Sequence, residues 1–248
     1  MFSKSTVKYI QSLQHKKFRD EYGAFIAEGP KVVGELLETN IFNCTNVYAL
    51  EEWIAAAPAS LKATLGGTLV AVKDFELEKI SALAKPNLVL AVFEKKPARQ
   101  LAFKDRLTLV LDDIQDPGNL GTIIRIADWF GIQDILCSLH TADMYNPKVV
   151  QSTMASLARV NVVYADITQQ LLSAHVKKYA AALDGTPLEK VDKLKEGIII
   201  IGNESKGISP AIMQMADEKI TIARVGLAES LNAGVATGII LHQLRITN

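Results

Sequence analysis

Residues 107–127 of the chain read LTLVLDDIQDPGNLGTIIRIA. Residues 107–111 form a short apolar run with the length of a buried strand, and the Pro-Gly pair after it predicts a turn. Apolar residues then recur at helical spacing, which predicts a helix that begins near Asn119 and carries Arg125 about two turns inside. Taken alone, this stretch allows Asn119 to be only the helix N-cap and Arg125 to pair with a surface acid. A strand, a tight turn and a helix in this order open an α/β unit.

The rest of the C-terminal part continues this alternation. Further strands are expected, with helical segments between most of them, at residues 135–138, 160–164, 179–183, 198–201 and 219–222. This order favours a parallel sheet that is covered by helices on both faces. Ligands gather at the carboxyl ends of such strands, so a site is expected in the loops after residues 111, 201 and 222.

The N-terminal part reads as a smaller set of helices and strands. Strands are expected there at residues 24–27, 46–50, 68–72 and 88–93. Residues 94–100 are polar, charged and interrupted by Pro97, which is typical of a linker. A chain of 248 residues also exceeds the usual size of one domain. We therefore predict two α/β domains, residues 1–100 and residues 105–248.

The composition is that of an ordinary globular protein. Apolar residues make up 49% of the chain and charged residues 22%, which argues against a disordered chain. No apolar run approaches the ~20 residues of a membrane span, and the N-terminus lacks the apolar core of a secretory signal. A cytoplasmic protein without a membrane partner is therefore expected. Cys44, Cys137 and the four histidines form no short-range cluster, so neither a disulfide scaffold nor a metal site is expected.

The charges are unevenly distributed although the net charge is zero. Residues 1–104 carry 14 lysines and arginines against 11 acidic residues. Five basic residues precede the first acidic one, namely Lys4, Lys8, Lys16, Lys17 and Arg19. Zero net charge argues against indiscriminate binding to nucleic acids. A solvated helix face and a local RNA contact explain the basic run equally well.

The two remaining loops exclude the common nucleotide-binding motifs. In residues 202–209 two glycines stand five apart, but Ile208 occupies the position where a phosphate-binding loop has lysine. No two glycines have the spacing that opens G-x-G-x-x-G, so the dinucleotide fingerprint and the similar turn of ordinary methyltransferases are absent. Residues 220–236 place Ser230 and Asn232 at the start of an apolar helix, where Ser230 alone could be the N-cap.

Together the three loops resemble the signature of the SpoU class of RNA 2′-O-ribose methyltransferases, within the trefoil-knotted methyltransferases. The matching motifs are Asn119-Leu120-Gly121 with Arg125 and Ala127, then Gly202-Asn203-Glu204 with Gly207, and finally Ser230-Leu231-Asn232 with Val235-Ala236. The N-terminal part, through residues 16–19 and 25–29, more loosely resembles an L30e-like substrate-binding domain. The resemblance implies an α/β protein in which a parallel-sheet domain with a trefoil knot follows a smaller α/β L30e-like domain.

Two positions depart from the family's pattern. Ala223 stands where proline is usual, and Asn232-Ala233-Gly234 stands in place of Asn-Val-Ser. Both are exchanges of small residues outside the polar positions. They bear on the rigidity of the third loop more than on its chemistry.

The resemblance implies transfer of a methyl group from S-adenosylmethionine to a ribose 2′-OH, without a metal. The expected catalytic residues are Arg125, Asn119, Glu204, Ser230 and Asn232. The expected cofactor contacts are Ile201, Gly202, Asn203, Ile222 and Leu231. Arg125 is expected near the 2′-OH. It is either the general base, although a guanidinium stays protonated above pH 12, or a bidentate clamp on an RNA phosphate.

The expected partner is RNA. Ribosomal RNA is favoured over transfer RNA because the N-terminal part resembles a ribosomal-protein module, and DNA is excluded because it lacks the 2′-OH. The resemblance also implies a homodimer whose active site is completed across the interface. The alternative is a non-catalytic RNA-binding or ribosome-assembly protein on the same fold, against which the presence of all five polar site residues argues.

Overall fold

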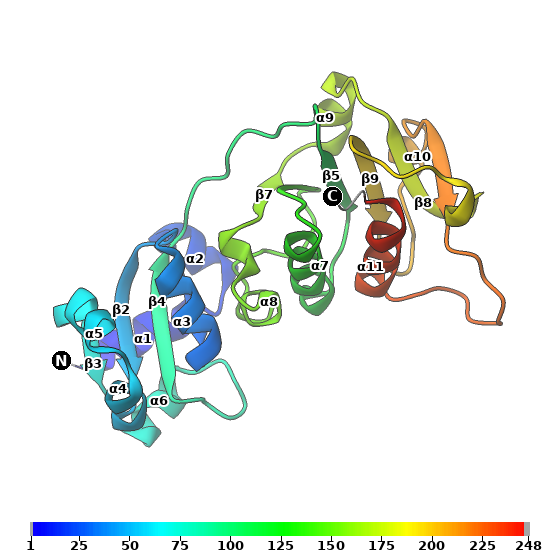
Figure 1. The fold of residues 1–248 in the computed structure, drawn as a ribbon. Helices are drawn as coiled ribbons and strands as arrows, with labels where there is room; N and C mark the ends of the chain where they lie inside the picture. The colour runs from blue at the N-terminus through cyan, green and yellow to red at the C-terminus, as the bar shows by residue number, and fades with distance from the viewer. Residues whose placement is uncertain (1, 246–248) are drawn as a thin grey trace. The chain divides into compact units, whose positions relative to one another are not determined.

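The computed structural model describes residues 2–245, and the chain divides into two compact units (Figure 1). The N-terminal unit comprises Met1–Pro97 and Tyr145–Ala158, and the C-terminal unit comprises Ala98–Met144 and Arg159–Asn248. A short segment from the middle of the chain thus belongs to the N-terminal unit. The domain limits drawn from the sequence, 1–100 and 105–248, remain a prediction about which stretches fold independently.

A four-stranded mixed sheet forms the centre of the N-terminal unit, in the order β1-β4-β2-β3. β4 is antiparallel to both β1 and β2, and β3 is parallel to β2. The strands are β1 (Ala24–Glu28), β2 (Cys44–Ala49), β3 (Leu69–Ala71) and β4 (Val89–Glu94). The helices are α1 (Lys4–Ser12), α2 (Lys16–Tyr22), α3 (Pro30–Thr39), α4 (Glu51–Ala56), α5 (Ala59–Leu65), α6 (Asp74–Ile80) and α8 (Pro147–Thr153), with short 3-10 turns η1 (Gly66–Thr68) and η2 (Ser156–Ala158). All four strands predicted in this part are present.

Both faces of this sheet are covered, because β1 is buried along its full length. On one face Ile26 packs in a core with Ile10 of α1 and Leu77 of α6. On the other face the Phe25 ring stacks on Phe93, with 5.6 Å between centroids, and lies 4.8 Å from the Tyr145 ring. Tyr145 thereby explains why the segment from Tyr145 to Ala158 belongs to this unit.

The C-terminal unit contains a six-stranded sheet in the order β10-β8-β9-β5-β6-β7, and every pair of neighbouring strands is parallel. Its strands are β5 (Leu107–Asp112), β6 (Asp134–Cys137), β7 (Asn161–Tyr164), β8 (Lys178–Pro187), β9 (Gly197–Gly202) and β10 (Glu218–Thr221). Its helices are α7 (Pro117–Trp129), α9 (Ile167–Ser173), α10 (Pro210–Met213) and α11 (Ala233–Leu244), with the turn η3 (Leu188–Lys190). The predicted α/β fold with a parallel C-terminal sheet is confirmed.

The central strands β5 and β9 are buried on both sides. Val110, Ile198 and Ile200 join a core with residues of α9 and α10, while the alternate side chains Leu109 and Ile199 are also fully buried. The helices α7 and α11 lie side by side (Figure 1). Asp112 and Gly202 are neighbours in the β5–β9 register, so the loops that follow these two strands leave the sheet together.

Two helix starts differ from the sequence-based expectation. α7 begins at Pro117, not near Asn119, because the Asp116 side chain caps it and proline suits the first helical position. α11 begins at Ala233 with Asn232 as its N-cap, so Ser230 lies before the helix. Asn119 is therefore not the N-cap of α7, and Ser230 is not the N-cap of α11. Within residues 2–245, no helix is long and apolar enough to cross a membrane.

Candidate active site

The first two loops are joined at the carboxyl edge of the C-terminal sheet. The backbone N–H of Ser209 donates to the Asp112 carboxylate over 2.7 Å. Nδ2 of Asn203 donates to the backbone oxygen of Asp113, also over 2.7 Å. Asp113 has a φ of 62°, a left-handed conformation that aspartate adopts more readily than most residues. These bonds fix the loop after β5 against the loop after β9.

Asn119 connects all three loops. Its Nδ2 donates to Oε1 of Glu204 over 2.7 Å, and its Oδ1 accepts from Nδ2 of Asn232 over 2.7 Å. Oδ1 of Asn232 in turn accepts from the backbone N–H groups of Gly234 and Val235, at 3.0 and 3.2 Å. The three side chains form one chain of hydrogen bonds that ends on a carboxylate.

Close backbone approaches make this arrangement possible. A Cβ on Gly202 would lie 2.3 Å from backbone atoms of Gly207 and Ile208, so only glycine allows the loop after β9 to fold back there. A Cβ on Gly234 would lie 2.8 Å from Cγ2 of Thr122, which brings the start of α11 close to α7. The three motifs therefore come together because of the small residues Gly202 and Gly234 as well as the polar residues.

Two of the five predicted catalytic residues lie outside this chain of hydrogen bonds. Arg125 is exposed on α7, and its side chain forms no hydrogen bond or ion pair with any residue from 2 to 245. It follows Asn119 by six residues, so the two side chains point roughly 120° apart around the helix axis. Ser230 is exposed in the segment before α11 and is likewise without a hydrogen-bond partner in the described part of the chain.

The residues expected to contact a cofactor lie at the ends of β9 and β10 and in the third loop. Ile201 is the buried end of β9, Asn203 fastens the second loop, and Ile222 is half-buried directly after β10. Residues 223–232 are exposed along their whole length, and Leu231 is 49% exposed. Among residues 2–245, no group of three His, Cys, Asp or Glu residues could hold a metal ion.

Sequence reasoning missed three acidic residues that shape the site. Asp112 holds the second loop, Asp113 adopts the left-handed turn, and Asp116 caps α7 by accepting from the Asn119 N–H over 2.9 Å. The available signal was their position, since consecutive acids directly after a buried strand lie at the carboxyl edge of a parallel sheet.

The chain matches known proteins along nearly its whole length. Residues 106–242 match the model of the SpoU rRNA Methylase family, and residues 4–91 match that of the MRM3-like substrate binding domain. The 23S rRNA (guanosine(2553)-2′-O)-methyltransferase RlmP of Bacillus subtilis is 30% identical over 96% of this chain and 95% of its own.

Solved structures agree with these matches. A putative RNA methyltransferase of the TrmH family from Porphyromonas gingivalis has a TM-score of 0.85 and 34% identity, over 99% of this chain and 98% of its own. The AdoMet-bound rRNA methyltransferase from Sinorhizobium meliloti has a TM-score of 0.85 and 30% identity, over 97% and 94%. These matches confirm the predicted fold class, in which a knotted methyltransferase domain follows a smaller α/β substrate-binding domain in the sequence. They also confirm the predicted class of enzyme. The chain belongs to the SpoU rRNA methylase family.

Proposed function

We propose that this protein transfers the methyl group of S-adenosylmethionine to a ribose 2′-OH of ribosomal RNA. The observation that carries the proposal is the hydrogen-bonded chain Glu204–Asn119–Asn232, in which one polar residue from each family motif meets at the carboxyl edge of the parallel sheet. Relatives named as methyltransferases of 23S rRNA, in Bacillus subtilis and Streptomyces viridochromogenes, support ribosomal RNA as the substrate. Transfer RNA is the rival substrate.

The residues at the site fit S-adenosylmethionine. Val225 and Leu227, at 101% and 99% exposure, present apolar side chains in the segment that directly follows β10. We propose that these two apolar side chains cover the flat adenine ring. Backbone groups at Ile201, Gly202, Asn203, Ile222 and Leu231 would then receive its polar edge and the ribose. When bound, S-adenosylmethionine supplies a methyl group that is already activated by its positively charged sulfur.

The side chains then have to orient the 2′-OH and remove its proton. Oε1 of Glu204 is held by Asn119, whereas Oε2 has no hydrogen-bond donor among residues 2–245. We assign to Oε2 the role of accepting a ribose hydroxyl. Positioning of this kind supplies about 7–11 kcal/mol of a barrier when reacting groups are aligned. Ser230 and Arg125 approach the RNA, with Arg125 either as base or as phosphate clamp.

We propose that the protein is a homodimer and that Arg125 completes the site of the partner copy. Trp129, one turn after Arg125 on α7, is 84% exposed. On the adjoining α11, Val235 and Ile239 are 51% and 39% exposed. Large exposed apolar side chains on two helices that contact each other are typical of a surface that another protein covers. A second copy would cover this surface, and the Arg125 of that copy would then lie near Asn119 of the first.

We further propose that residues 1–100 bind the RNA, that residues 105–248 carry out the transfer, and that the protein acts in the cytoplasm. The test is methyl transfer in vitro from S-adenosylmethionine to a ribosomal RNA transcript, with protein that has been treated with a chelator to remove metal ions. The label should be found on a ribose, and calorimetry should show one cofactor site per chain. A folded protein that binds RNA but not S-adenosylmethionine would instead support the non-catalytic assembly factor.

A further inference from the structure

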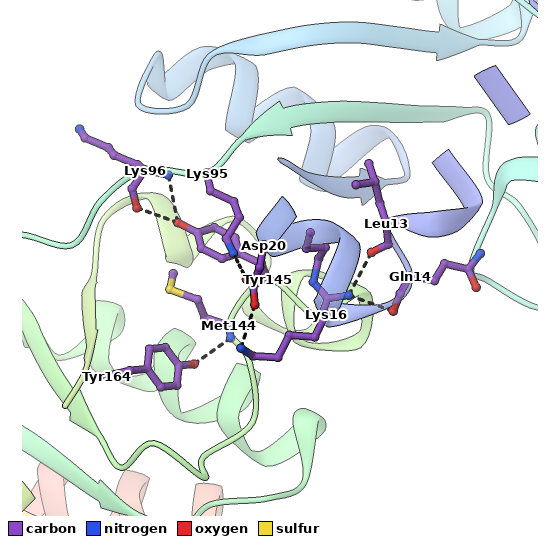
Figure 2. A network of polar contacts seen from close by, with 10 residues as sticks. Leu13, Gln14, Lys16, Asp20, Lys95, Lys96, Met144, Tyr145 and Tyr164 are labelled. Carbon is purple, nitrogen blue, oxygen red and sulfur yellow. Dashed lines mark hydrogen bonds and ion pairs between the residues drawn. The ribbon is translucent and has the colours of Figure 1, made fainter. Parts of the chain in front are cut away.

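The orientation of α2 in the N-terminal unit is fixed from its buried side. Arg19 is only 1% exposed, and its guanidinium donates to the backbone oxygens of Leu13 and Gln14 at the end of α1, each over 2.9 Å. Figure 2 shows these two oxygens converging on one side chain. Arg19 thereby fixes α2, a helix of seven residues, against the end of α1.

Next to Arg19, a partly exposed face of α2 carries a stripe of aromatic rings. His15, Phe18 and Tyr22 follow one another at the spacing of one helix face. The Phe18 and Tyr22 rings are within 17° of parallel with 6.3 Å between centroids, and Tyr9 of α1 meets Tyr22 edge-on at 5.1 Å. Tyr22 remains 49% exposed. If these rings only packed against one another, less of the Tyr22 side chain would be exposed to water.

The charge around this stripe is positive. Figure 2 shows Lys16 and Lys95 both reaching Asp20, with N–O distances of 3.0 and 2.5 Å, so this acid is fully compensated. Lys17 lies 5.7 Å from the centre of the Phe18 ring, and neither Lys17 nor Lys8 forms an ion pair with a described residue. Two further acids lie in this region: Glu21, exposed next to Tyr22, and Glu94, which adds to the effects of burial and of Tyr22 in raising the pKa of Tyr9.

We propose that the Phe18–Tyr22 face of α2 is a stacking site for an unpaired nucleotide of the RNA substrate, whose phosphates are bound by Lys8 and Lys17. Every nucleobase has a flat face that stacks on aromatic rings, and the neighbouring phosphates need cations. A paired base in an A-form helix is unavailable for such stacking, so the site selects single-stranded segments such as loops. This inference rests on the proposed RNA substrate and specifies which part of the RNA the N-terminal unit contacts.

Binding of a single-stranded adenylate oligomer of about 12 nucleotides to the full-length protein tests this site without requiring turnover. Tyr22→Leu should weaken binding by about five-fold or more, while Tyr22→Phe should retain it. The matched control is Phe75→Leu on α6, another ring that is 52% exposed and has a lysine over it. It should leave binding within about two-fold. Lys17→Gln should lower the salt dependence of binding by roughly one counterion.

In methylation assays Tyr22→Leu should raise the KM for RNA and leave kcat and cofactor affinity unchanged. Equal binding of the oligomer by the parent and by folded Tyr22→Leu, or equal weakening by Phe75→Leu, would overturn the proposal. Absence of methyl transfer to any RNA, with the oligomer still bound through Tyr22, would refute the proposed enzyme activity but not this site.

Discussion

Nδ2 of Asn232 donates to Oδ1 of Asn119 over 2.7 Å, although the two residues are 113 positions apart in the chain. Each residue is also tied to the start of a helix. The Asn119 N–H is bound by the Asp116 cap of α7, and Asn232 is itself the cap of α11. Since Asn119 donates onward to Glu204, the position of that carboxylate depends on both helices.

Asn119→Asp should lower the rate of methyl transfer by about a hundred-fold or more, because it replaces a donor to Glu204 with a second carboxylate. Lowering the pH should restore part of the rate, since protonating either acid of a close pair re-creates a donor. A pH–rate profile measures both effects. The control is Gln169→Glu, the same amide-to-acid change at an exposed position on α9, which should stay near parent activity. An active Asn119→Asp enzyme with a flat profile would contradict the role of this bond.

Arg125→Ala should abolish methyl transfer and leave the affinity for S-adenosylmethionine within a few-fold, because Arg125 acts on the RNA. Arg125→Lys separates its two possible roles. A phosphate clamp should lose RNA affinity with its pH–rate profile unchanged, whereas a base should keep some activity and shift the profile to lower pH. Arg159→Ala removes a surface arginine that pairs with Asp128 of the same helix and serves as the control. Full activity of Arg125→Ala would refute the assignment.

Trp129→Glu should convert a dimer into a monomer in sedimentation experiments, because a charge would replace the most exposed large apolar side chain of α7. The monomer should bind S-adenosylmethionine and lose methyl transfer. The control is Leu172→Glu on α9, where another large apolar side chain is 71% exposed. Dimers that persist in Trp129→Glu would place the interface elsewhere.

Mixing two inactive variants tests whether Arg125 acts across the interface. After subunit exchange between Arg125→Ala and Asn119→Asp, one site of each mixed dimer would contain both native residues. Activity should then return to about a quarter of the parent value, given random pairing in a two-fold dimer. If both residues served the same subunit, every site would keep one defect and the mixture would stay inactive.

Gly202→Ala should destabilise the protein by about 1–3 kcal/mol, or prevent folding of the second loop, because the new methyl group would meet backbone atoms that cannot rotate away. Gly226→Ala is the matched control, since nothing lies within 4 Å of its added Cβ. Thermal unfolding compares the two variants. Equal melting temperatures would show that the loop after β9 can relax freely.

Glu28 gives the N-terminal unit a pH dependence of its own. Burial raises the pKa of Glu28 above its ordinary value of 4.5, against the hydrogen bonds that Ser81 and the Ala82 N–H donate to it. The folded state therefore holds this proton more tightly than the unfolded state, and its stabilising effect is lost as the pH rises from 4.5 through the raised pKa. Urea unfolding of Glu28→Gln should lack this part of the decline, whereas exposed Glu38→Gln should retain it. Parallel curves for parent and Glu28→Gln would contradict the assignment.

The strands and the family could be predicted because they depend on local pattern. β5 and β9 are unbroken apolar runs, and the polar residues of the three motifs are readable in order. The predicted starts of α7 and α11 were wrong because each helix has two candidate N-caps in its sequence. Asp116 caps α7 in place of Asn119, and Asn232 caps α11 in place of Ser230. The bond between Asn119 and Asn232, and the docking of Tyr145 on Phe25, join segments far apart in sequence and leave no local signal.

Ribose methylation mapped over total RNA, in cells with and without this gene, tests the central claim most directly. We predict that one 2′-O-methyl nucleotide of ribosomal RNA disappears with the gene. It should return when the parent protein is supplied and stay absent when Asn119→Asp is supplied. A ribosomal RNA methylation pattern that is unchanged by loss of the gene, or that Asn119→Asp restores in full, would contradict the account.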